Sequence, residues 1–205
     1  MPDAFPPRSD TRLLLQNMHV PPGVSVLDVG TGMGVLAVVA CKAGAERCVA
    51  LDINPQSVRN AKSNTERHQL NGRLDIRLSD GLAALAPGER FDLVLANLPG
   101  WAAPASDHVE AAQWDTGFAT NRAFFAKVRK YLSPNGHILM AKANYPGIND
   151  VPAMAEENGL MARIVAAQAP KEDDPRRYVI LVFAQAQRRD QWILAYGACR
   201  VAPVG

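Results

Sequence analysis

Three glycines recur at every second position in residues 28–34, whose sequence is DVGTGMG. An apolar run, residues 25–29, enters this segment, and an apolar, alanine-rich stretch, residues 34–43, leaves it. This order predicts a buried strand, a tight turn and the start of a helix. Glycine permits the turn and leaves bare backbone for a ligand, and the free N–H groups of a helix N-terminus favour an anionic group. The segment is therefore a candidate site for a nucleotide or nucleoside cofactor.

The spacing of the glycines distinguishes between cofactors. A dinucleotide-binding fingerprint has the pattern G-x-G-x-x-G, whereas here the third glycine is Gly34 and Val35 takes the later position. A phosphate-binding loop would end in Gly-Lys-Ser or Gly-Lys-Thr, and neither follows the glycines. The alternative without a ligand is a glycine turn that only packs a helix on a strand.

Acidic residues follow two further apolar runs. Asp52 ends the predicted strand 48–51, about 20 residues after the glycines, and this is the spacing of the carboxylate that accepts from ribose hydroxyls. A helix cap is its alternative role, although Asn54 already supplies a cap signal. Asp80 follows the third predicted strand and could accept from an adenine amino group. With Gly81 it could instead form a plain Asp-Gly turn.

Four segments together, residues 26–34, 51–55, 79–82 and 97–99, resemble the motifs of class I S-adenosylmethionine-dependent methyltransferases, and the resemblance extends over residues 5–186. It implies a Rossmann-like fold, S-adenosylmethionine as the cofactor and a set of cofactor-binding residues. These residues are Thr11, Asp28, Gly30, Thr31, Gly32, Gly34, Asp52, Ile53, Asp80, Gly81 and Asn97.

The resemblance gives each part of the cofactor an expected partner. Residues 30–32 would lie near the methionine end, with Asp28 behind them. Asp52 would bind the ribose, Ile53 would face the adenine ring and Asp80 would accept from the adenine amino group. This cofactor has an amino-acid end and no pyrophosphate, so the helix N-terminus would meet a carboxylate.

The predicted strand 91–96 is followed by Asn97, Leu98 and Pro99, which resemble the Asn-Pro-Pro-Tyr or Asn-Leu-Pro-Tyr motif of methyltransferases that act on planar nitrogens. Such a nitrogen has a delocalised lone pair and is a poor nucleophile. The side-chain oxygen of Asn97 and the carbonyl of Leu98 would hold its N–H groups and direct the lone pair at the methyl group. The protein would then supply alignment and exclusion of water. An ordinary turn-starting asparagine is the alternative.

The fourth position of this motif departs from the family pattern, because Gly100 replaces the aromatic residue that stacks on a flat substrate. Trp101 or Trp114 could take its place, and otherwise the acceptor need not be a flat base. His108 lies in the same long connection and is a candidate base or substrate contact, with a solvated loop residue as the alternative. These three side chains are the predicted substrate-binding residues.

Residues 5–11, with sequence FPPRSDT, resemble the segment that precedes the cofactor motif in release-factor glutamine methyltransferases. In those enzymes the segment closes over the cofactor, so the resemblance places Thr11 near the methionine end. The alternative is a proline-rich lead to a helix that is capped by Asp10.

Helices and strands that alternate along the chain must position these residues. We expect helices over residues 11–19, 34–43, 54–69, 121–132 and 148–158. We expect strands over residues 25–29, 48–51, 74–78, 91–96, 137–141, 161–167 and 178–186.

This alternation predicts an α/β, Rossmann-like doubly wound sheet of seven strands, mostly parallel and covered on both faces. The linker 168–177 is too short for a helical crossover, so the last two strands should pair antiparallel and form a C-terminal edge with an antiparallel strand. We expect a single domain over residues 1–205. It comprises an N-terminal lead and helix (1–22), a core (23–186) and a C-terminal extension (187–205).

Composition excludes several classes of protein. The 205 residues carry a net charge of +2, too little to favour a nucleic-acid partner or a membrane surface. No apolar run reaches the roughly 18 residues of a membrane span, and the proline-containing N-terminus does not resemble a signal peptide. Three cysteines without metal-binding spacing suggest reduced thiols in a cytoplasmic protein and no metal site.

These observations favour an N-methyltransferase that acts on a small molecule or on a peptide or protein. A nucleic-acid amino group is the alternative acceptor. A non-catalytic, cofactor-binding partner subunit and a nicotinamide-dependent oxidoreductase are the alternatives from other classes. The apolar residues of the C-terminal extension 187–205 could pack on the domain or form a homodimer.

Overall fold

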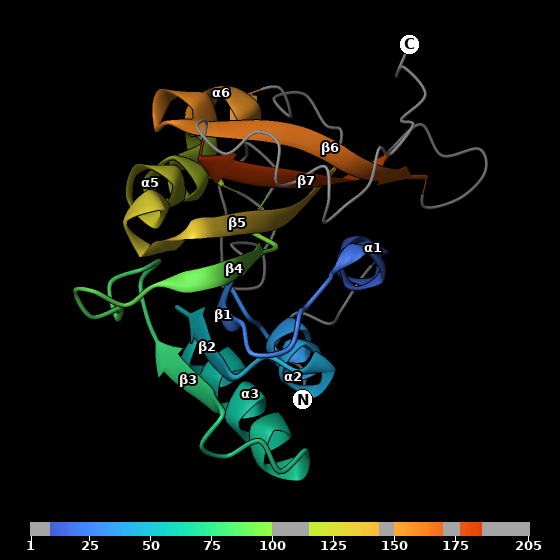
Figure 1. The fold of residues 1–205 in the computed structure, drawn as a ribbon, viewed down its shortest axis with the longest axis vertical. Coiled ribbons are helices and arrows are strands. Elements are labelled where there is room, and N and C mark those ends of the chain that lie inside the picture. The colour runs from blue at the N-terminus through green and yellow to red at the C-terminus, as the bar shows by residue number, and fades with distance from the viewer. Residues whose placement is uncertain (1–8, 100–114, 144–149, 170–176, 186–205) are drawn as a thin grey trace.

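A computed structural model describes residues 9–99, 115–143, 150–169 and 177–185. Its centre is a seven-stranded sheet in the order β3-β2-β1-β4-β5-β7-β6 (Figure 1). The strands are β1 Ser25–Val29, β2 Arg47–Asp52, β3 Leu74–Leu78, β4 Phe91–Ala96, β5 Leu132–Ala143, β6 Leu160–Gln168 and β7 Tyr178–Gln185. The predicted Rossmann-like sheet, mostly parallel with an antiparallel C-terminal strand, is confirmed.

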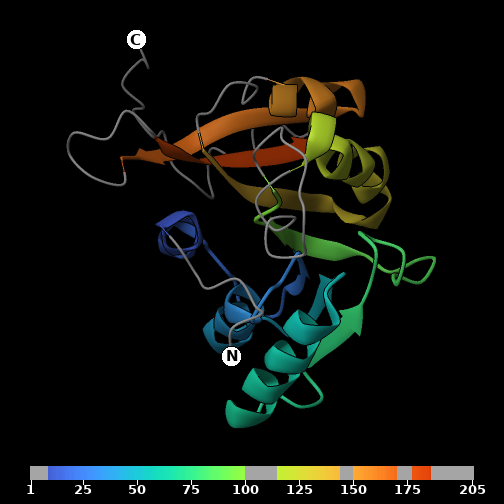
Figure 2. The ribbon, with the colours of Figure 1, turned by 180° about the vertical axis from the view of Figure 1, so that it is seen from behind.

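Helices cover both faces of the sheet, as Figure 1 and the opposite view in Figure 2 show. The helices on one face are α1 Ser9–Asn17, α2 Val35–Ala43 and α3 Pro55–Arg67. On the other face are α5 Ala119–Val128 and α6 Asp150–Glu157, and two short 3-10 helices, η1 Thr116–Phe118 and η2 Arg129–Tyr131, flank α5. None of the helices among the described residues is long and apolar enough to cross a membrane.

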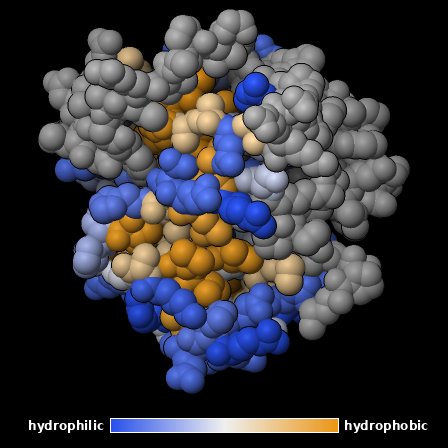
Figure 3. Space-filling model, turned by 90° about the vertical axis from the view of Figure 1, so that its right-hand side faces the viewer, coloured by the Kyte–Doolittle hydropathy of each residue, from blue (hydrophilic) through white to orange (hydrophobic). Residues whose placement is uncertain are grey.

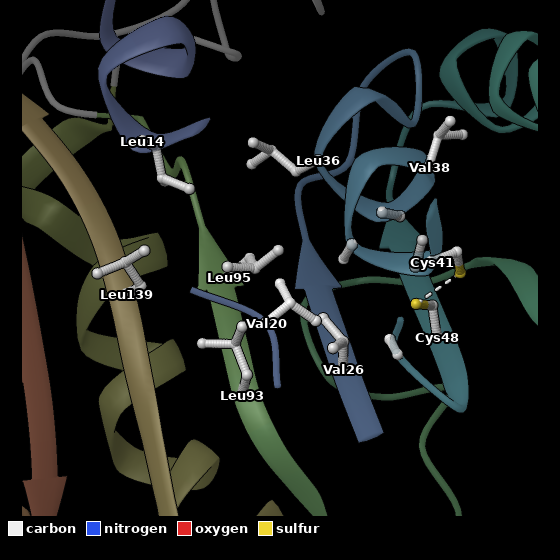
Figure 4. Close-up of a cluster of buried hydrophobic side chains, with 14 of the residues drawn as sticks. Leu14, Val20, Val26, Leu36, Val38, Cys41, Cys48, Leu93, Leu95 and Leu139 are labelled. Carbon is white, nitrogen blue, oxygen red and sulfur yellow. Dashed lines mark hydrogen bonds between the residues drawn. The ribbon is translucent and has the colours of Figure 1, made fainter. Parts of the chain in front are cut away.

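Alternation along the strands divides the core into two layers. Val26 of β1 faces the α1–α3 layer, whereas Leu27 and Val29 face the α5–α6 layer. Figure 4 shows the first layer, where leucines and valines of β1, β4 and β5 meet α1 and α2. The thiols of Cys41 and Cys48 join α2 to β2 within this layer, with 2.7 Å between the sulfur atoms. Both are free cysteines, as expected.

The antiparallel strand β7 lies between β5 and β6 and is not at the edge of the sheet. The last two strands pair antiparallel, as predicted, and together they form one end of the sheet, with β6 as the edge strand. The order of these two strands has a physical cause in the burial pattern. The run VILVFA in β7 is buried at every position, which is typical of an interior strand, whereas most residues of β6 are only partly buried.

The predicted boundary between the 121–132 helix and the following strand is also wrong. The helix α5 ends at Val128, and β5 begins at Leu132, five residues before the expected start at 137. Residues 133–136, which we expected to stop the helix as a loop, form an irregularity inside β5, because the register with β4 shifts there. Gly136 fits this bulge since a Cβ at that position would lie 2.6 Å from the carbonyl oxygen of Phe91.

The helix α2 is apolar around most of its surface, which is unusual for a surface helix. Figure 3 shows the side of the molecule that carries α1, α2 and α3, and an apolar area separates two hydrophilic areas there. Val35 and Val39 are the partly exposed valines of α2. Close packing beneath α2 keeps the helix N-terminus in place next to the glycine turn.

Gly34 brings α2 against α3. Its φ is +81°, and a Cβ at this position would lie 3.1 Å from Cβ of Ala61. We therefore predict that Gly34→Ala lowers the free energy of unfolding by about 2–4 kcal/mol, because left-handed strain and overpacking add together. Urea unfolding followed by circular dichroism measures this change.

Gly72→Ala is the matched control. Gly72 has a similar φ of +86°, but a Cβ at this position would have no atom within 4 Å. This variant therefore suffers only the backbone strain of about 1–2 kcal/mol. Equal losses of stability in the two variants would show that contact with α3 does not constrain Gly34.

Candidate active site

Backbone hydrogen bonds join the glycine turn to the end of β2. The N–H groups of Gly30 and Thr31 both donate to the carbonyl of Leu51, at 2.9 and 3.0 Å. The N–H of Gly32 donates to Oδ2 of Asp52 at 2.8 Å. The turn therefore has a fixed position relative to Asp52, and the two predicted cofactor-binding elements lie at the same edge of the sheet.

Asp28 is completely buried beneath this turn. Its Oδ2 accepts from the hydroxyl of Thr31 at 2.6 Å, and its Oδ1 has no hydrogen-bond partner. Burial raises the pKa of Asp28 to about 7, and hydrogen bonds from Thr31 and from the backbone of Ala37 oppose this increase. A buried carboxylate with an unpaired oxygen is costly, so its retention favours a role toward a ligand.

Three further predicted residues follow β2 and β3. Asp52 is only partly buried, and its Oδ1 accepts from the N–H of Asn54 at 2.8 Å. Burial raises the pKa of Asp52, while its backbone hydrogen bonds lower it. Ile53 exposes 62% of its surface, which is a high value for a large apolar residue. Asp80 and Gly81 are exposed at the end of β3.

These residues fit S-adenosylmethionine. The carboxylates of Asp52 and Asp80 favour a cofactor with cationic ammonium and sulfonium groups. An exposed apolar side chain at residue 53 suits the face of an adenine ring. Asp28 also offers an unpaired oxygen, and carboxylates accept hydrogen bonds from hydroxyl and amino groups. Gly34, which we predict to contact the cofactor, also makes room for α3 because it has no side chain.

The side chain of Asn97 is oriented by α1. Its Nδ2 donates to the hydroxyl of Thr11 at 3.1 Å and to Oδ2 of Asp10 at 3.3 Å. A carboxylate oxygen can only accept a hydrogen bond, so the Asn97 atom next to Asp10 must be the amide nitrogen. The amide oxygen Oδ1 of Asn97 therefore points away from Asp10 and Thr11. Thr11, predicted near the methionine end, thus lies beside the predicted catalytic asparagine.

The carbonyls of Leu98 and Pro99, the two residues after Asn97, accept hydrogen bonds from side chains of other elements. Nζ of Lys142 donates to the carbonyl oxygens of Leu98 and Pro99, at 2.9 and 3.0 Å. Nδ2 of Asn121 also donates to the Pro99 carbonyl, at 2.9 Å, and to Oδ2 of Asp115, at 2.8 Å. The predicted hydrogen-bond acceptor Leu98 therefore already accepts one hydrogen bond within the protein, which leaves the second lone pair of its oxygen.

Sequence reasoning missed this second set of residues. Asp115 caps α5 by accepting from the N–H groups of Thr120 and Asn121, and Lys142 is 4% exposed at the end of β5. The one signal in the sequence is a lysine in the otherwise apolar run ILMAKA. Burial lowers the pKa of Lys142 to about 7, while the charges of Asp115 and Asp10 oppose this decrease.

The three predicted substrate-binding residues, Trp101, His108 and Trp114, lie outside the described residues, and so does Gly100. Among the described parts of the chain, no group of three or more His, Cys, Asp or Glu side chains is arranged to hold a metal ion.

Comparison with known proteins identifies similarity in residues 10–100, the part of the chain that contains these motifs. The family model for ribosomal protein L11 methyltransferase (PrmA) matches residues 10–100, from α1 through the Asn97 turn. Ribosomal protein L11 methyltransferase from Burkholderia multivorans is 41% identical over 90 residues, which are 43% of this chain and 28% of that protein. The matched segment thus spans little more than a quarter of the curated relative.

Solved structures extend the similarity to the whole fold. A ribosomal protein L11 methylase from Lactobacillus delbrueckii subsp. bulgaricus superposes with a TM-score of 0.66 at 22% identity, over 89% of this chain and 81% of that one. A methyltransferase from Pyrococcus furiosus gives a TM-score of 0.70 at 16% identity, over 90% and 87%. The chain has the class I, Rossmann-like methyltransferase fold, a class that uses S-adenosylmethionine as its methyl donor. The finer resemblance to release-factor glutamine methyltransferases stays a prediction.

The buried Asp28 predicts a pH dependence of stability. The unfolded chain releases this proton near pH 3.8, whereas the folded protein keeps it until about pH 7. Stability therefore falls as the pH rises through this window, because the unfolded state binds fewer protons. We predict that Asp28→Asn removes this decrease. The free energy of unfolding of the variant, measured relative to wild type, should therefore be higher at pH 8 than at pH 4 by up to roughly 4 kcal/mol. Urea unfolding at the two pH values measures the difference.

The exposed Glu46→Gln is the control for the loss of a negative charge. Burial lowers the pKa of His137 to about 4, so that residue makes stability rise with pH between about 4 and 6.5. It is present in every variant, and its contribution cancels in the comparison with wild type. Parallel pH profiles for wild type and Asp28→Asn would contradict the prediction.

Proposed function

We propose that the chain is an S-adenosylmethionine-dependent methyltransferase that transfers a methyl group to nitrogen. The supporting observation is the orientation of Asn97 at the carboxyl end of β4, where ligands bind in open α/β sheets. Its nitrogen is held by Thr11 and Asp10, so its oxygen is available to accept from an N–H group of the acceptor. Leu98 connects this turn to the cofactor loop, since its Cδ2 would lie 3.5 Å from a Cβ at Gly30.

One set of residues would bind the cofactor, and another would orient the acceptor. Asp52, Ile53 and the backbone of residues 30–32 would hold S-adenosylmethionine, which supplies an activated methyl group, and Asp28 would support this loop from behind. Asn97 would accept a hydrogen bond from the acceptor nitrogen and so direct its lone pair. Such alignment can contribute roughly 7–11 kcal/mol to lowering the barrier. The fold covers Asn97 with α1, which limits access of water to this side of the turn.

We propose a protein or peptide nitrogen as the acceptor, within the wider class that includes small molecules. The support is the name of the matching relatives, which act on ribosomal protein L11. This proposal includes a cytoplasmic location. The matched segment covers 28% of that relative. Recombinant ribosomal protein L11 from the relative's organism is therefore the first acceptor to test, with tritium-labelled S-adenosylmethionine as the donor.

Asp52→Ala tests the cofactor half of the proposal. Loss of a charged hydrogen-bond acceptor should weaken binding of S-adenosylmethionine about 10- to 100-fold, as measured by isothermal titration calorimetry. Asp75→Ala is the control, because Asp75 is an exposed residue of β3 whose charge pairs with Arg77. Absence of binding by the wild-type chain at millimolar S-adenosylmethionine would refute the proposed cofactor.

Asn97→Ala tests the transfer half. We expect methyl transfer to fall roughly 100-fold, because the acceptor nitrogen loses its alignment, while the affinity for S-adenosylmethionine measured by calorimetry changes by less than about twofold. The exposed Asn71→Ala controls for loss of an amide elsewhere. Unchanged transfer by Asn97→Ala would remove Asn97 from the mechanism, whatever the acceptor.

A further inference from the structure

Lys142 is a buried cation at the end of an apolar strand. The preceding residues of β5, Ile138 to Ala141, are at most 1% exposed and apolar, and Lys142 itself is 4% exposed. A buried ammonium group is destabilising unless hydrogen bonds and nearby charges compensate for its lost hydration. An apolar side chain of similar length would fill the same space at lower cost. The position of the lysine therefore calls for an explanation other than packing.

The contacts of Nζ supply that explanation. Its hydrogen bonds go to consecutive carbonyls of one turn, those of Leu98 and Pro99. Pro99 has no N–H and restricts Leu98 to extended backbone, so the rotation of these two peptide planes decides where their carbonyls point. Asn121 reinforces the arrangement through a second hydrogen bond to the Pro99 carbonyl.

The turn is thus held from both faces of the sheet. Asn97 faces the α1 layer, where Thr11 and Asp10 accept from its amide. The carbonyls of the next two residues face the α5 layer, where Lys142 donates to both. A turn fixed from one face only could rotate about its own axis, and that rotation would move Oδ1 of Asn97.

We infer that Lys142 is a positioning residue, which fixes the carbonyls of Leu98 and Pro99 and thereby presents Asn97 to the acceptor. The inference rests on the proposed function for its catalytic consequence. The hydrogen bonds themselves can be tested without any acceptor. Lys142 acts through the turn and is not assigned a contact with the cofactor or the reacting atoms.

Lys142→Met tests the contact directly, because methionine fills similar volume and cannot donate a hydrogen bond. Leu98-Pro99 is the only Leu-Pro pair in the sequence. Labelling leucine with carbonyl ¹³C and proline with ¹⁵N therefore isolates one carbonyl resonance, that of Leu98. We expect this resonance to move upfield in Lys142→Met, since the carbonyl loses its donor, and to stay in place in the exposed control Lys130→Met. An unmoved Leu98 resonance in Lys142→Met overturns the inference.

Kinetics test the consequence of that contact. With ribosomal protein L11 and tritium-labelled S-adenosylmethionine, we expect kcat of Lys142→Met to fall roughly 100-fold. The Kd for S-adenosylmethionine should stay within about twofold of the wild-type value. An equal kcat for Lys142→Met and wild type overturns the positioning role but leaves the proposed function intact. If the wild-type chain transfers no methyl group to ribosomal protein L11, that proposed acceptor fails, and the Leu98 resonance still decides whether Lys142 holds the turn.

A measurement on the wild-type chain covers the case in which Lys142→Met does not fold. The Leu98 resonance should titrate with pH as the Lys142 ammonium loses its proton, and Asn121→Leu should retain this titration because it removes only the second donor to Pro99. The charged groups that act on Lys142 are Asp115, before α5, and Asp10, in α1. A Leu98 resonance that stays constant over the pH range in which the Cε resonance of Lys142 itself titrates would count against the contact.

Discussion

A single carbonyl oxygen, that of Leu51, determines where the candidate site forms. It accepts from the N–H groups of two residues, Gly30 and Thr31, and so fixes the turn after β1 to the end of β2. The next residue of β2, Asp52, adds a side-chain contact with Gly32. The parallel pairing of β1 with β4, in which Val29 lies beside Ala96, places the turn after β4 at the same edge.

In the turn after β4, different elements orient the side chain of Asn97 and the backbone of the two residues that follow it. Asn97 is oriented through its amide nitrogen by α1, which precedes the sheet in the chain. The backbone of the two following residues is oriented by Lys142 and Asn121, which come later in the chain. Elements that are distant in sequence thus determine the conformation of the turn after β4. This dependence is consistent with a site that works by alignment more than by supplying its own reactive group.

Local sequence was sufficient where structure follows from short-range chemistry. Apolar runs located the strands within one residue at each end, except for β5, which begins five residues earlier than predicted. Asn54 caps α3 by accepting from the N–H of Gln56, as its residue type suggested. Interactions between distant residues were not accessible in this way. No local signal pairs Lys142 with Leu98. Proline and glycine at 134 and 136 suggested a loop, because the fit of Gly136 to a bulge against Phe91 cannot be read from local sequence. The insertion of β7 beside β5 likewise depends on which partners remain available in three dimensions.

The position of β7 has a consequence for the order in which the sheet can be completed. Among the described strands, β6 pairs only with β7, although β6 is synthesised first. A nascent chain that has reached β6 therefore contains a strand with no place in the sheet, and β5 is an open edge at that stage. When β7 emerges, it forms backbone hydrogen bonds with β5 on one side and with β6 on the other. The pairing of β5, β7 and β6 can therefore be completed only after β7 has been synthesised.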